Sequence, residues 1–431
     1  MDMEQNKYDV VIIGGGLAGL CAAVLLAQKG EKVAILEKRK EFGGRASTKE
    51  VSGSFFNLGP HALYKKGNVV KLLHSLNIKL NGGTPSTKGS VYYENKKFEL
   101  PSNIVSIFKT KLLSWAEKKE FIRLMLKIGT INTANLHHQT LQQWAEDNIH
   151  SIKNRELFYT FSRLACYVNA PHIVNAGAVL NQLKLSLGGA IYVNRGWQSF
   201  IQQLLEKAKK LGVTLLSDCS VDKIDFTNQV KQIHFKRNEQ LYTFKSPWAL
   251  LTVPPNEIMR IVKDIDNSPL SNVLNQCIPV KAACLDVSLN TLTNSSQHFS
   301  LDMNHGYYYS NHSNAAKLSY HPNHHVIHVM KYLAPNESSS IEELSSFLDN
   351  IQPSWERFVV TKRFLPNLTV THRIPTTSPI NISELAANEF PGLLLAGEWV
   401  SNDFLLAEAA ITTIEASVQQ ILFKKEFKKI G

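Results

Sequence analysis

The chain has 431 residues, of which 44% are hydrophobic and 19% charged, a balance typical of a globular protein with two or three domains. Basic residues exceed acidic ones by 11 (47 against 36), but no base-reading motif accompanies them, so we expect no nucleic-acid partner. The five cysteines form no CxxC pair, which predicts neither a disulfide framework nor a zinc site.

A strand–turn–helix–strand unit is predicted at the start of the chain. Residues 8–13, YDVVII, form the short β-branched run of a buried parallel strand, and the glycine-rich turn GGGLAG follows directly. An apolar helix ends at Gly30, and a second strand over residues 32–36 is followed by Glu37. This context turns a GxGxxG sequence, which is weak alone, into a specific indication of a Rossmann-type dinucleotide site.

Each residue of the turn has a physical role in such a site. Gly14 makes the tight turn, Gly16 lets the backbone approach a pyrophosphate, and Gly19 allows the helix to pack closely on the strand. The helix N-terminus presents free N–H groups and a positive dipole to the phosphates. Glu37 is placed to accept hydrogen bonds from ribose hydroxyls, and its carboxylate would repel the 2′-phosphate of NADP.

A second glycine motif indicates which dinucleotide to expect. Phe42-Gly43-Gly44-Arg45 follows Glu37, and the resulting E-x(5)-G-G-R pattern resembles the second signature of the FAD-dependent amine oxidase superfamily. That superfamily includes monoamine and polyamine oxidases, protoporphyrinogen oxidase and carotenoid (phytoene) desaturases. Arginine supplies a planar, permanently charged fork suited to phosphate. The resemblance implies an FAD-binding flavoprotein.

The resemblance extends along nearly the whole chain. Residues 57–61, NLGPH, resemble the family loop that passes beside the flavin ring, where His61 either faces the ring or is a hydrogen-bonded turn residue. Capping boxes begin at Ser114 and Thr140 and predict the starts of two helices. Residues from about 100 to 185 are therefore expected to form a helical insertion, which the family uses to roof its substrate cavity.

Other segments also match the family. Residues 95–103 resemble the hairpin of the substrate domain, and Val221 stands at the position whose backbone meets the adenine in relatives. The sequence LLLAGEW places Gly397 and Glu398 where relatives carry a Gly-Asp or Gly-Glu pair near the ribityl and phosphate groups. The helix around Ala410 should direct its N-terminal amides at the flavin pyrimidine, although two glycines of the family pattern are missing there.

The histidines near residue 325 do not predict a metal site. His325 and His328 would point to opposite faces of a strand, and no acid nearby completes a ligand set, so we interpret them as solvated or core residues, as we do His321 and His324. No pattern identifies a catalytic residue. Monoamine oxidases attach FAD through a cysteine near the C-terminus, whereas the last cysteine here is Cys284. We therefore expect non-covalent FAD.

The expected fold is α/β, with a Rossmann-like FAD-binding domain that is discontinuous in sequence and an α+β substrate domain containing a helical insertion and an antiparallel sheet. The FAD-binding domain is expected to comprise residues 1–80, 186–262 and 372–431, with residues 81–185 as the helical part and 263–371 as the sheet part of the substrate domain. The expected cofactor contacts are Gly14, Gly15, Gly16, Leu17, Ala18, Gly19, Glu37, Lys38, Gly44, Arg45, Gly59, Pro60, His61, Val221, Gly397, Glu398, Ala410 and Ile411.

The function implied by the resemblance is that of an FAD-dependent oxidoreductase. It would remove two electrons, as hydride, from a C–N or C–C bond of a small amine or an apolar isoprenoid-like substrate, with dioxygen or a quinone-like compound as acceptor. Two alternatives stay open: a flavin-dependent isomerase without net redox change, and a binding protein of the Rab GDP-dissociation inhibitor type. The intact nucleotide motifs, with Glu37, Arg45 and Glu398, argue against the binding protein.

The sequence predicts a cytoplasmic protein, because it shows no secretory signal and no apolar run of the roughly 20 residues that span a membrane. Peripheral contact with the inner face of a membrane is a further expectation. It would use the lysine-rich tail, residues 421–431, and a patch formed by Phe108, Leu112 and Trp115 beside Lys109 and Lys111. The alternative for the short tail, which we favour, is a final helix whose lysines only hydrate the surface.

Overall fold

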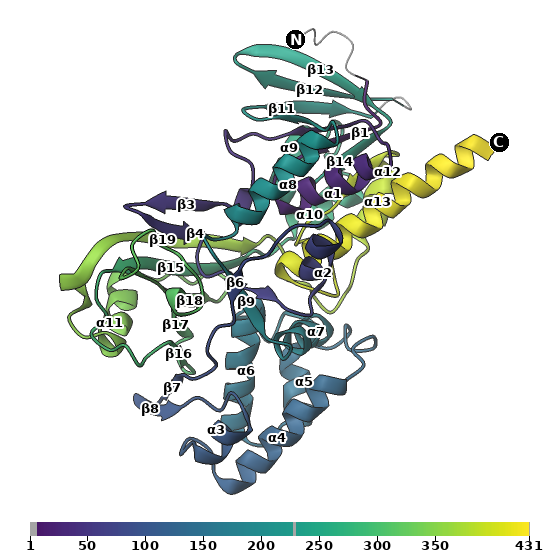
Figure 1. Cartoon of the computed structure of the whole chain (residues 1–431). Coiled ribbons are helices and arrows are strands. Elements are labelled where there is room, and N and C mark those ends of the chain that lie inside the picture. Colours follow the sequence, from purple (N-terminus) through teal and green to yellow (C-terminus); the bar gives the residue numbers. More distant parts are fainter. Residues whose placement is uncertain (1–6, 227–229, 431) are drawn as a thin grey trace.

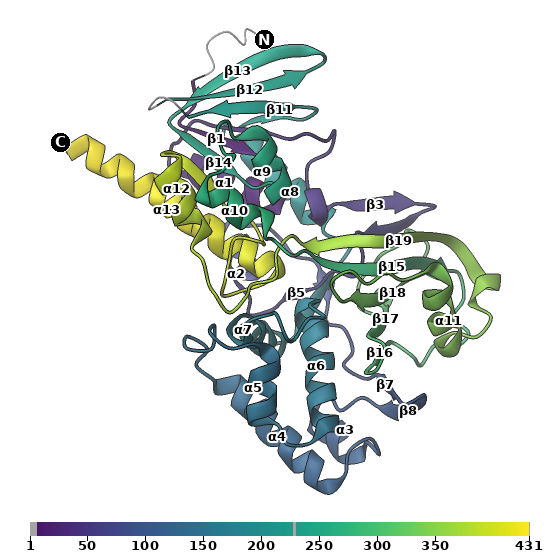
Figure 2. The same ribbon diagram turned by 180° about the vertical axis from the view of Figure 1, so that it is seen from behind.

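The computed structural model describes residues 7–226 and 230–430, with side chains as far as Phe423. Three parts are visible in the ribbon: a parallel sheet flanked by helices, a seven-stranded sheet, and a group of helices at the end of the molecule remote from the parallel sheet (Figures 1 and 2). Within the described residues, no helix is both long enough and apolar enough to cross a bilayer. The side chains of the tail lysines lie outside the described residues.

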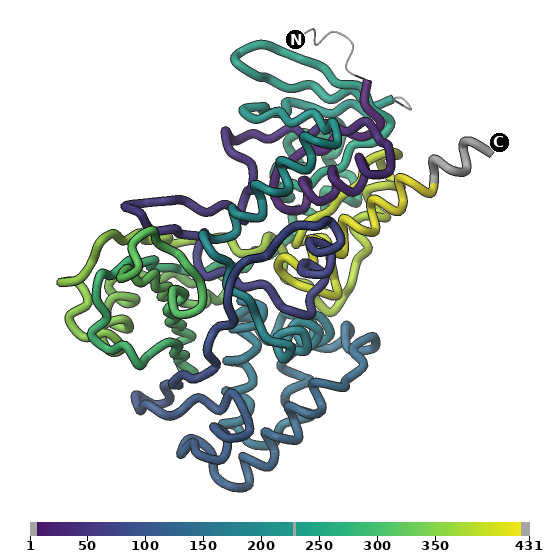
Figure 3. Tube along the Cα trace, in the orientation of Figure 1, coloured from purple at the N-terminus to yellow at the C-terminus, as the bar shows by residue number. Residues whose placement is uncertain are grey.

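The parallel sheet assembles strands from distant parts of the chain. Its five strands, in spatial order, are β10 (Thr214–Leu216), β2 (Val33–Leu36), β1 (Val10–Ile13), β14 (Trp248–Leu251) and β20 (Leu393–Leu395), and every pairing is parallel. Four of the strands are short, β-branched or leucine-rich runs, as strands buried on both faces require. The trace shows the purple, teal and yellow segments of the chain converging here (Figure 3).

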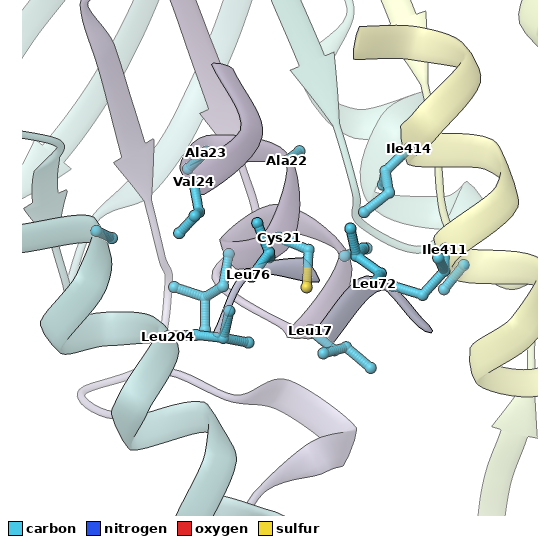
Figure 4. Packing of buried hydrophobic residues seen from close by; sticks show 14 of the residues in the cluster. Leu17, Cys21, Ala22, Ala23, Val24, Leu72, Leu76, Leu204, Ile411 and Ile414 are labelled. Carbon is cyan, nitrogen blue, oxygen red and sulfur yellow. The ribbon is translucent and has the colours of Figure 1, made fainter. Parts of the chain in front are cut away.

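Helix α1 (Leu17–Gln28) lies at the centre of the hydrophobic core on one face of this sheet. It is apolar on nearly all sides, which is the pattern of a fully buried helix. It is surrounded by α2 (Asn68–Ser75), α8 (Gln198–Lys210) and α13 (Leu406–Ile430), whose side chains Leu72, Leu204 and Ile411 converge on Cys21 (Figure 4). The glycine turn that begins α1 is thereby held in a fixed position.

The other face of the parallel sheet carries a second core. A three-stranded antiparallel sheet covers it, formed by β11 (Ser220–Asp225), β12 (Lys231–Arg237) and β13 (Gln240–Ser246). Three short helices pack beside these strands: α9 (Pro255–Ile261), α10 (Pro269–Asn275) and α12 (Ile382–Glu389).

The seven-stranded sheet is antiparallel except for one parallel pair, β16 with β7. Its strands, in spatial order, are β19 (Val359–Thr371), β15 (Val280–Leu289), β18 (His325–Leu333), β17 (Tyr307–Asn311), β16 (Phe299–Asp302), β7 (Ser90–Tyr93) and β8 (Lys96–Glu99). Helix α11 (Ile341–Ile351) packs on it. The hairpin β7–β8 forms the edge of this sheet, and its second strand lies within residues 95–103, which resemble a hairpin of the substrate domain.

The helical part contains α3 (Ile104–Lys109), α4 (Trp115–Thr130), α5 (Leu141–Asn148), α6 (Ile152–Cys166) and α7 (Ala176–Ser186). Both predicted capping boxes are present, since Ser114 and Thr140 accept hydrogen bonds from the N3 amides of α4 and α5. Helix α4 continues through Gly129, which we expected to end it. The placement of Leu112 in a surface patch was wrong: the turn between α3 and α4 directs this side chain into the core.

Small two- and three-stranded sheets connect these parts. Strand β3 (Thr48–Val51) pairs with β4 (Ser54–Asn57), and β9 (Ala190–Val193) lies between β5 (Leu63–Tyr64) and β6 (Gly82–Gly83). The segment from β4 to β5 contains the loop of residues 57–61 and connects β4, which contacts the seven-stranded sheet through Ser54 and Ser288, with β5 and α2.

Candidate functional site

The two glycine motifs of the sequence meet at the C-terminal edge of the parallel sheet. The Gly43 amide donates to the Gly15 carbonyl at 2.8 Å, and Gly16 and Gly43 form a parallel bridge. Helix α1 begins directly after Gly16, with its first amides free of intrahelical partners. This edge of a parallel sheet, beside a helix N-terminus, is where open α/β folds bind phosphate-bearing ligands.

The glycines of the turn have different surroundings. Gly14 has φ +105°, and a Cβ there would lie 2.7 Å from Thr252 Oγ1, while a Cβ at Gly19 would lie 2.0 Å from the Gly14 carbonyl oxygen. A Cβ at Gly16 would meet nothing closer than the Gly43 carbonyl oxygen at 3.9 Å. Gly14 and Gly19 are thus required by the packing of the protein itself, whereas Gly16 leaves space that the fold does not fill.

Glu37 is held beside this turn by backbone amides. Its two carboxylate oxygens accept hydrogen bonds from the Gly15 amide at 2.6 Å and the Arg39 amide at 2.9 Å. A carboxylate has about four acceptor positions, so two remain for the hydroxyls of a ribose. Lys38 instead extends to Glu257, with an Nζ–Oε1 distance of 3.2 Å.

Val221 lies near Glu37, because the residues just before it are hydrogen-bonded to the end of β2. The Cys219 amide donates to the Glu37 carbonyl at 2.8 Å, which ties the start of β11 to the end of β2. The Val221 carbonyl accepts a hydrogen bond from Arg260 Nη2 at 2.9 Å.

At the start of α1, the side chains of Leu17 and Ala18 are buried in the core, so these two residues would present their backbone to a ligand.

A first polar cluster, called here the phosphate-side cluster, consists of Arg45, His372 and Glu398. Both Arg45 Nη atoms contact the Glu398 carboxylate, at 2.7 and 2.5 Å, and His372 Nδ1 lies 2.7 Å from Glu398 Oε1. Burial alone would raise the pKa of the Glu398 carboxyl, but Arg45 and His372 outweigh it and hold the pKa well below its usual range. Arg45 follows Gly44, so the ion pair adjoins the glycine turn.

The loop of residues 57–61 passes next to this cluster. His61 Nδ1 lies 3.0 Å from the Gly59 carbonyl and Nε2 lies 3.1 Å from the Arg45 carbonyl. The ring packs edge-to-face on Trp197 at 4.6 Å, and burial lowers the pKa of His61 to about 4. These contacts agree with the turn-residue interpretation of His61. The Pro60 carbonyl accepts a hydrogen bond from the Tyr167 hydroxyl at 2.7 Å, which fixes the loop from its other side.

The start of α13 approaches the same region from the C-terminal part of the chain. Gly397 has φ +142°, and its amide donates to Thr413 Oγ1 at 3.0 Å, so one threonine joins the Gly397–Glu398 turn to the helix. Ala410 and Ile411 are buried, and the Ile411 side chain points into the core around α1, which leaves its backbone for a ligand (Figure 4).

A second polar cluster, called here the sheet cluster, was missed in the sequence. Asp286 on β15 contacts His328 on β18, with Oδ1 and Nδ1 2.6 Å apart, and Arg363 on β19 through its other oxygen. Our expectation that no acid lies near these histidines was wrong for His328. A lone aspartate inside the apolar run AACLDVSL was the available signal, since a buried carboxylate requires charged partners.

The sheet cluster adjoins the loop of residues 57–61. Arg363 Nη2 also donates to the Asn57 carbonyl. Cys284, Asp286 and His328 together have the composition of a metal-ligand set. Arg363, however, binds one oxygen of the Asp286 carboxylate, and the Cys284 thiol donates to the other at 3.1 Å. The negative charge of Asp286 is therefore balanced by Arg363 and does not require a metal ion. Of the remaining histidines, His321 is exposed on the surface.

The residues present fit a large ligand with polar ring edges. Buried polar groups near the loop that have no hydrogen-bond partner within the described chain include Trp197 Nε1, Tyr332 Oη, Gln182 Nε2 and, in the sheet cluster, His328 Nε2. The Tyr332 ring packs edge-to-face on Tyr167, and Gln182 Oε1 accepts from the Leu405 amide, just before α13, at 3.5 Å. Buried donors without partners cost about 1–3 kcal/mol each, so this region suits a ligand that supplies acceptors, as an isoalloxazine ring does.

Comparison with known proteins accounts for this arrangement. A family model for flavin containing amine oxidoreductases matches residues 17–277, which is more than half of the chain. The chain belongs to this family. Its members are FAD-containing proteins, and the amine oxidase resemblance of the two glycine motifs is confirmed.

Two relatives of this chain illustrate the range of the family. A 1-hydroxycarotenoid 3,4-desaturase of Flavobacterium sp. (strain P99-3) is 25% identical over 255 residues, covering 51% of this chain and 51% of the relative. A flavin-containing amine oxidase of Oncorhynchus mykiss is 23% identical over 297 residues, covering 64% of this chain and 56% of the relative. The matched region thus spans about half of the length of these proteins.

Solved structures share the fold along the whole chain. An oxidoreductase from Methanosarcina mazei superposes with a TM-score of 0.75 at 16% identity, covering 96% of this chain and 100% of that chain. A putative protoporphyrinogen oxidase from Exiguobacterium sp. 255-15 gives a TM-score of 0.72 at 16% identity, covering 98% and 100%. The mixed α/β fold is therefore that of the flavin-dependent amine oxidases.

Proposed function

We propose that this chain holds FAD non-covalently and removes two electrons, as hydride, from a C–N or C–C bond of a small organic substrate. The observation that carries the proposal is the open space at Gly16. Two glycine motifs converge there at a helix N-terminus, and the fold itself leaves the position of a Cβ unfilled. A pyrophosphate needs this close approach to backbone amides.

The residues of the site would share the binding of FAD as follows. The first amides of α1 would face the pyrophosphate, and Glu37 would accept the ribose hydroxyls. Arg45, with its fork already directed by Glu398, would contribute charge beside the phosphates. The loop around Gly59 and the N-terminal amides of α13 would border the flavin ring. The division into an FAD-binding domain and a substrate domain at the boundaries given above is part of the same proposal.

FAD supplies the two-electron acceptor, and dioxygen or a quinone-like compound would receive the electrons afterwards. The contribution of the protein is to orient the substrate and to exclude water. The part of the site next to residues 57–61 suits this role, because the neighbouring tyrosines Tyr167, Tyr308 and Tyr332 are buried or half-buried aromatic groups from two separate parts of the chain. Burial raises the pKa of each of these phenols well above its usual range, so they stay neutral.

Non-covalent attachment follows from the state of the nearest thiol. A Cβ added at Gly59 would lie 3.7 Å from Cys284 Sγ, so this cysteine adjoins the loop proposed to border the ring. Burial and the Asp286 carboxylate raise the pKa of the Cys284 thiol well above its usual range. A thiol held protonated is a poor nucleophile, which argues against a covalent bond to flavin.

The visible absorption spectrum of the purified protein, followed by anaerobic titration, tests the proposal. We expect a flavin spectrum that is released into solution by acid or heat and is bleached by a substrate from a panel of amines and isoprenoids. Bleaching by an amine with no response to isoprenoids would assign the substrate class, and the reverse would assign the other. Absence of flavin after supplementation with FAD would contradict the proposal.

A pair of glycine variants tests directly whether the open space at Gly16 holds the pyrophosphate. Gly16→Ala should leave the stability of the FAD-free protein unchanged, because the methyl group meets nothing closer than the Gly43 carbonyl oxygen at 3.9 Å, but should lower FAD affinity at least tenfold. Gly129→Ala is the matched control: its methyl group meets nothing within 4 Å and lies inside α4, remote from the site, so FAD affinity should stay unchanged. Equal FAD affinity in both variants would contradict the placement of the pyrophosphate.

A further inference from the structure

Large apolar side chains are exposed together on α3 and α4. Ile104, Val105, Phe108, Trp115 and Leu126 are each between 49% and 68% exposed. They make up five of the fourteen large hydrophobic side chains that are exposed among the described residues, although α3 and α4 are short segments of the chain. Single exposed apolar residues are ordinary, but a cluster of this kind on adjacent helices marks an interaction surface.

The position of Leu126 extends this surface along α4. It stands eleven residues after Trp115, which is close to three full turns, so both side chains lie on the same face of the helix. Ile122, which is partly buried, lies between them on that face. We call the surface formed by α3 and this face of α4 the apolar tip.

The rings at the apolar tip are held in place from within. Phe108 and Trp115 contact each other with ring centroids 5.9 Å apart. The buried Lys118 donates through Nζ to the Phe108 carbonyl at 2.8 Å and lies 4.9 Å from the centroid of the Trp115 ring. Capping boxes at Asn103 and Ser114 fix the starts of both helices. The rings are therefore presented outwards by a preorganised support.

The exposed charged residues of α3, α4 and the turn between them are basic. Lys109, Lys111, Lys119 and Arg123 are exposed. Two nearby acids are turned towards α6 instead and are engaged there. Glu117 accepts from the Ser114 amide at 2.7 Å and from Ser151 Oγ at 2.9 Å, and Glu120 accepts from Asn154 Nδ2 and from the His150 amide, each at 2.6 Å.

We propose that the apolar tip docks on an anionic lipid bilayer, with its aromatic and aliphatic side chains in the interface and its lysines at the headgroups. The combination of exposed Trp, Phe and aliphatic groups with bordering lysines is complementary to such a surface. A second copy of this chain fits less well, because a symmetric contact through this patch would bring lysines against lysines. The proposal is independent of the flavin chemistry.

The apolar tip lies at the end of the molecule remote from the parallel sheet in both opposite views (Figures 1 and 2). Docking through it leaves the nucleotide site uncovered. Helix α6 leads from the helical part to the loop of residues 57–61, because Tyr167, directly after this helix, donates to the Pro60 carbonyl.

Co-sedimentation of the holoprotein with vesicles tests the proposal. We expect binding to vesicles of equal parts phosphatidylglycerol and phosphatidylcholine at low salt, weaker binding at high salt, and at least tenfold weaker binding to pure phosphatidylcholine. The double variant Phe108→Ser, Trp115→Ser should lose at least tenfold in affinity for the anionic vesicles. The matched control replaces two exposed leucines elsewhere, Leu187→Ser and Leu241→Ser, and should bind as the wild type does.

Three results would overturn the proposal. The first is no binding of the wild type to anionic vesicles at low salt. The second is equal binding by the tip variant and the wild type, or loss of binding only when Lys424, Lys425, Lys428 and Lys429 are replaced by Gln. The third is a dimer, measured by light scattering, that the Phe108 and Trp115 changes convert to a monomer. Thermal stability and flavin content of the tip variant should match the wild type, which separates this test from that of the proposed function.

Discussion

The phosphate-side cluster and the sheet cluster are built from the same three groups. Each has a buried carboxylate, an arginine fork and a histidine Nδ1 on the carboxylate. In the phosphate-side cluster Arg45 is 39% and His372 23% exposed, so the ion pair opens onto the proposed ligand site. In the sheet cluster the carboxylate and the histidine are fully buried. Arg363 is less exposed than Arg45, at 22%, and already donates to Asp286 and to the Asn57 carbonyl. The more accessible Arg45 can add a phosphate to its partners, whereas Arg363 joins the sheet to the loop of residues 57–61.

This difference in access leads to a difference in what each cluster should contribute. Removal of one partner of a buried ion pair leaves the other charge without compensation. Breaking the sheet cluster should therefore mainly lower the stability of the protein. Breaking the phosphate-side cluster should mainly cost cofactor affinity. The clusters are also linked through the loop of residues 57–61, since the Arg45 carbonyl contacts His61 and Arg363 donates to the Asn57 carbonyl.

The largest expected effect is from Asp286→Asn. The substitution keeps the shape but leaves Arg363 without the counter-charge of a buried carboxylate, which should lower the free energy of unfolding by about 3–5 kcal/mol. Urea denaturation of the FAD-free protein at pH 7 measures it. Asp222→Asn, at an exposed position of β11, is the control and should change the stability by less than about 0.5 kcal/mol. A loss below about 1 kcal/mol for Asp286→Asn would refute the role assigned to the sheet cluster.

The next effect concerns His61, which lies between the clusters. Its pKa in the folded protein is about 4, lower than the ordinary value of 6.5. As the pH falls below 6.5, the unfolded chain binds a proton that the folded protein does not, so stability decreases until the pH reaches about 4. This lowering of the pKa corresponds to at most about 3.4 kcal/mol, and to less because the ring is partly exposed to solvent.

The variant His61→Asn isolates this contribution. Its stability should fall less steeply than that of the wild type between pH 6.5 and pH 4, whatever its stability at pH 7. Burial is the main cause that lowers the pKa of His312, and His328 and His61 add to it, so the comparison measures His61 together with its effect on His312. Parallel curves for the two proteins over this range would show that His61 is protonated as freely in the folded state as in the unfolded state.

For the phosphate-side cluster, Arg45→Ala should lower FAD affinity roughly tenfold to a hundredfold, because a hydrogen bond to a charged group is worth about 1.5–3 kcal/mol. The melting temperature should fall with it at fixed FAD concentration, since bound ligand stabilises the native state. Fluorescence titration of the FAD-free protein with FAD measures the affinity. Arg357→Ala, at an exposed arginine near α11, should leave it unchanged. The cluster assignment fails if the two variants retain FAD equally.

The nucleotide site and the sheet cluster also differ in how far the sequence could predict them. The glycine turn, Glu37 and the Gly43–Gly44 motif were predictable because each is determined by backbone geometry within one βαβ unit. The capping boxes are more local still. The fold of the parallel sheet followed from these motifs and from short apolar runs, which are typical of strands buried on both faces.

The sheet cluster could not be predicted from local patterns. Asp286 faces His328 on one neighbouring strand and Arg363 on the other, and these register partners are 42 and 77 residues away. Only the pairing of β15 with both β18 and β19 brings them together. The placement of Leu112 failed for a related reason, because the direction of a side chain in a turn between helices depends on the core beneath it.

The smallest expected effect is that of Glu37→Gln. Glu37 is a third carboxylate in this region, and its partners are backbone amides in place of an arginine. Glu37→Gln retains one oxygen for the Gly15 or Arg39 amide, so the fold should be preserved. The ribose would lose a charged acceptor, at a cost of about 1 kcal/mol, which is less than tenfold in FAD affinity. The FAD titration used for Arg45→Ala measures it, with Glu50→Gln on the exposed strand β3 as control. A loss larger than that of Arg45→Ala would mean that the ribose, and not the phosphate-side cluster, dominates the binding of this half of the cofactor.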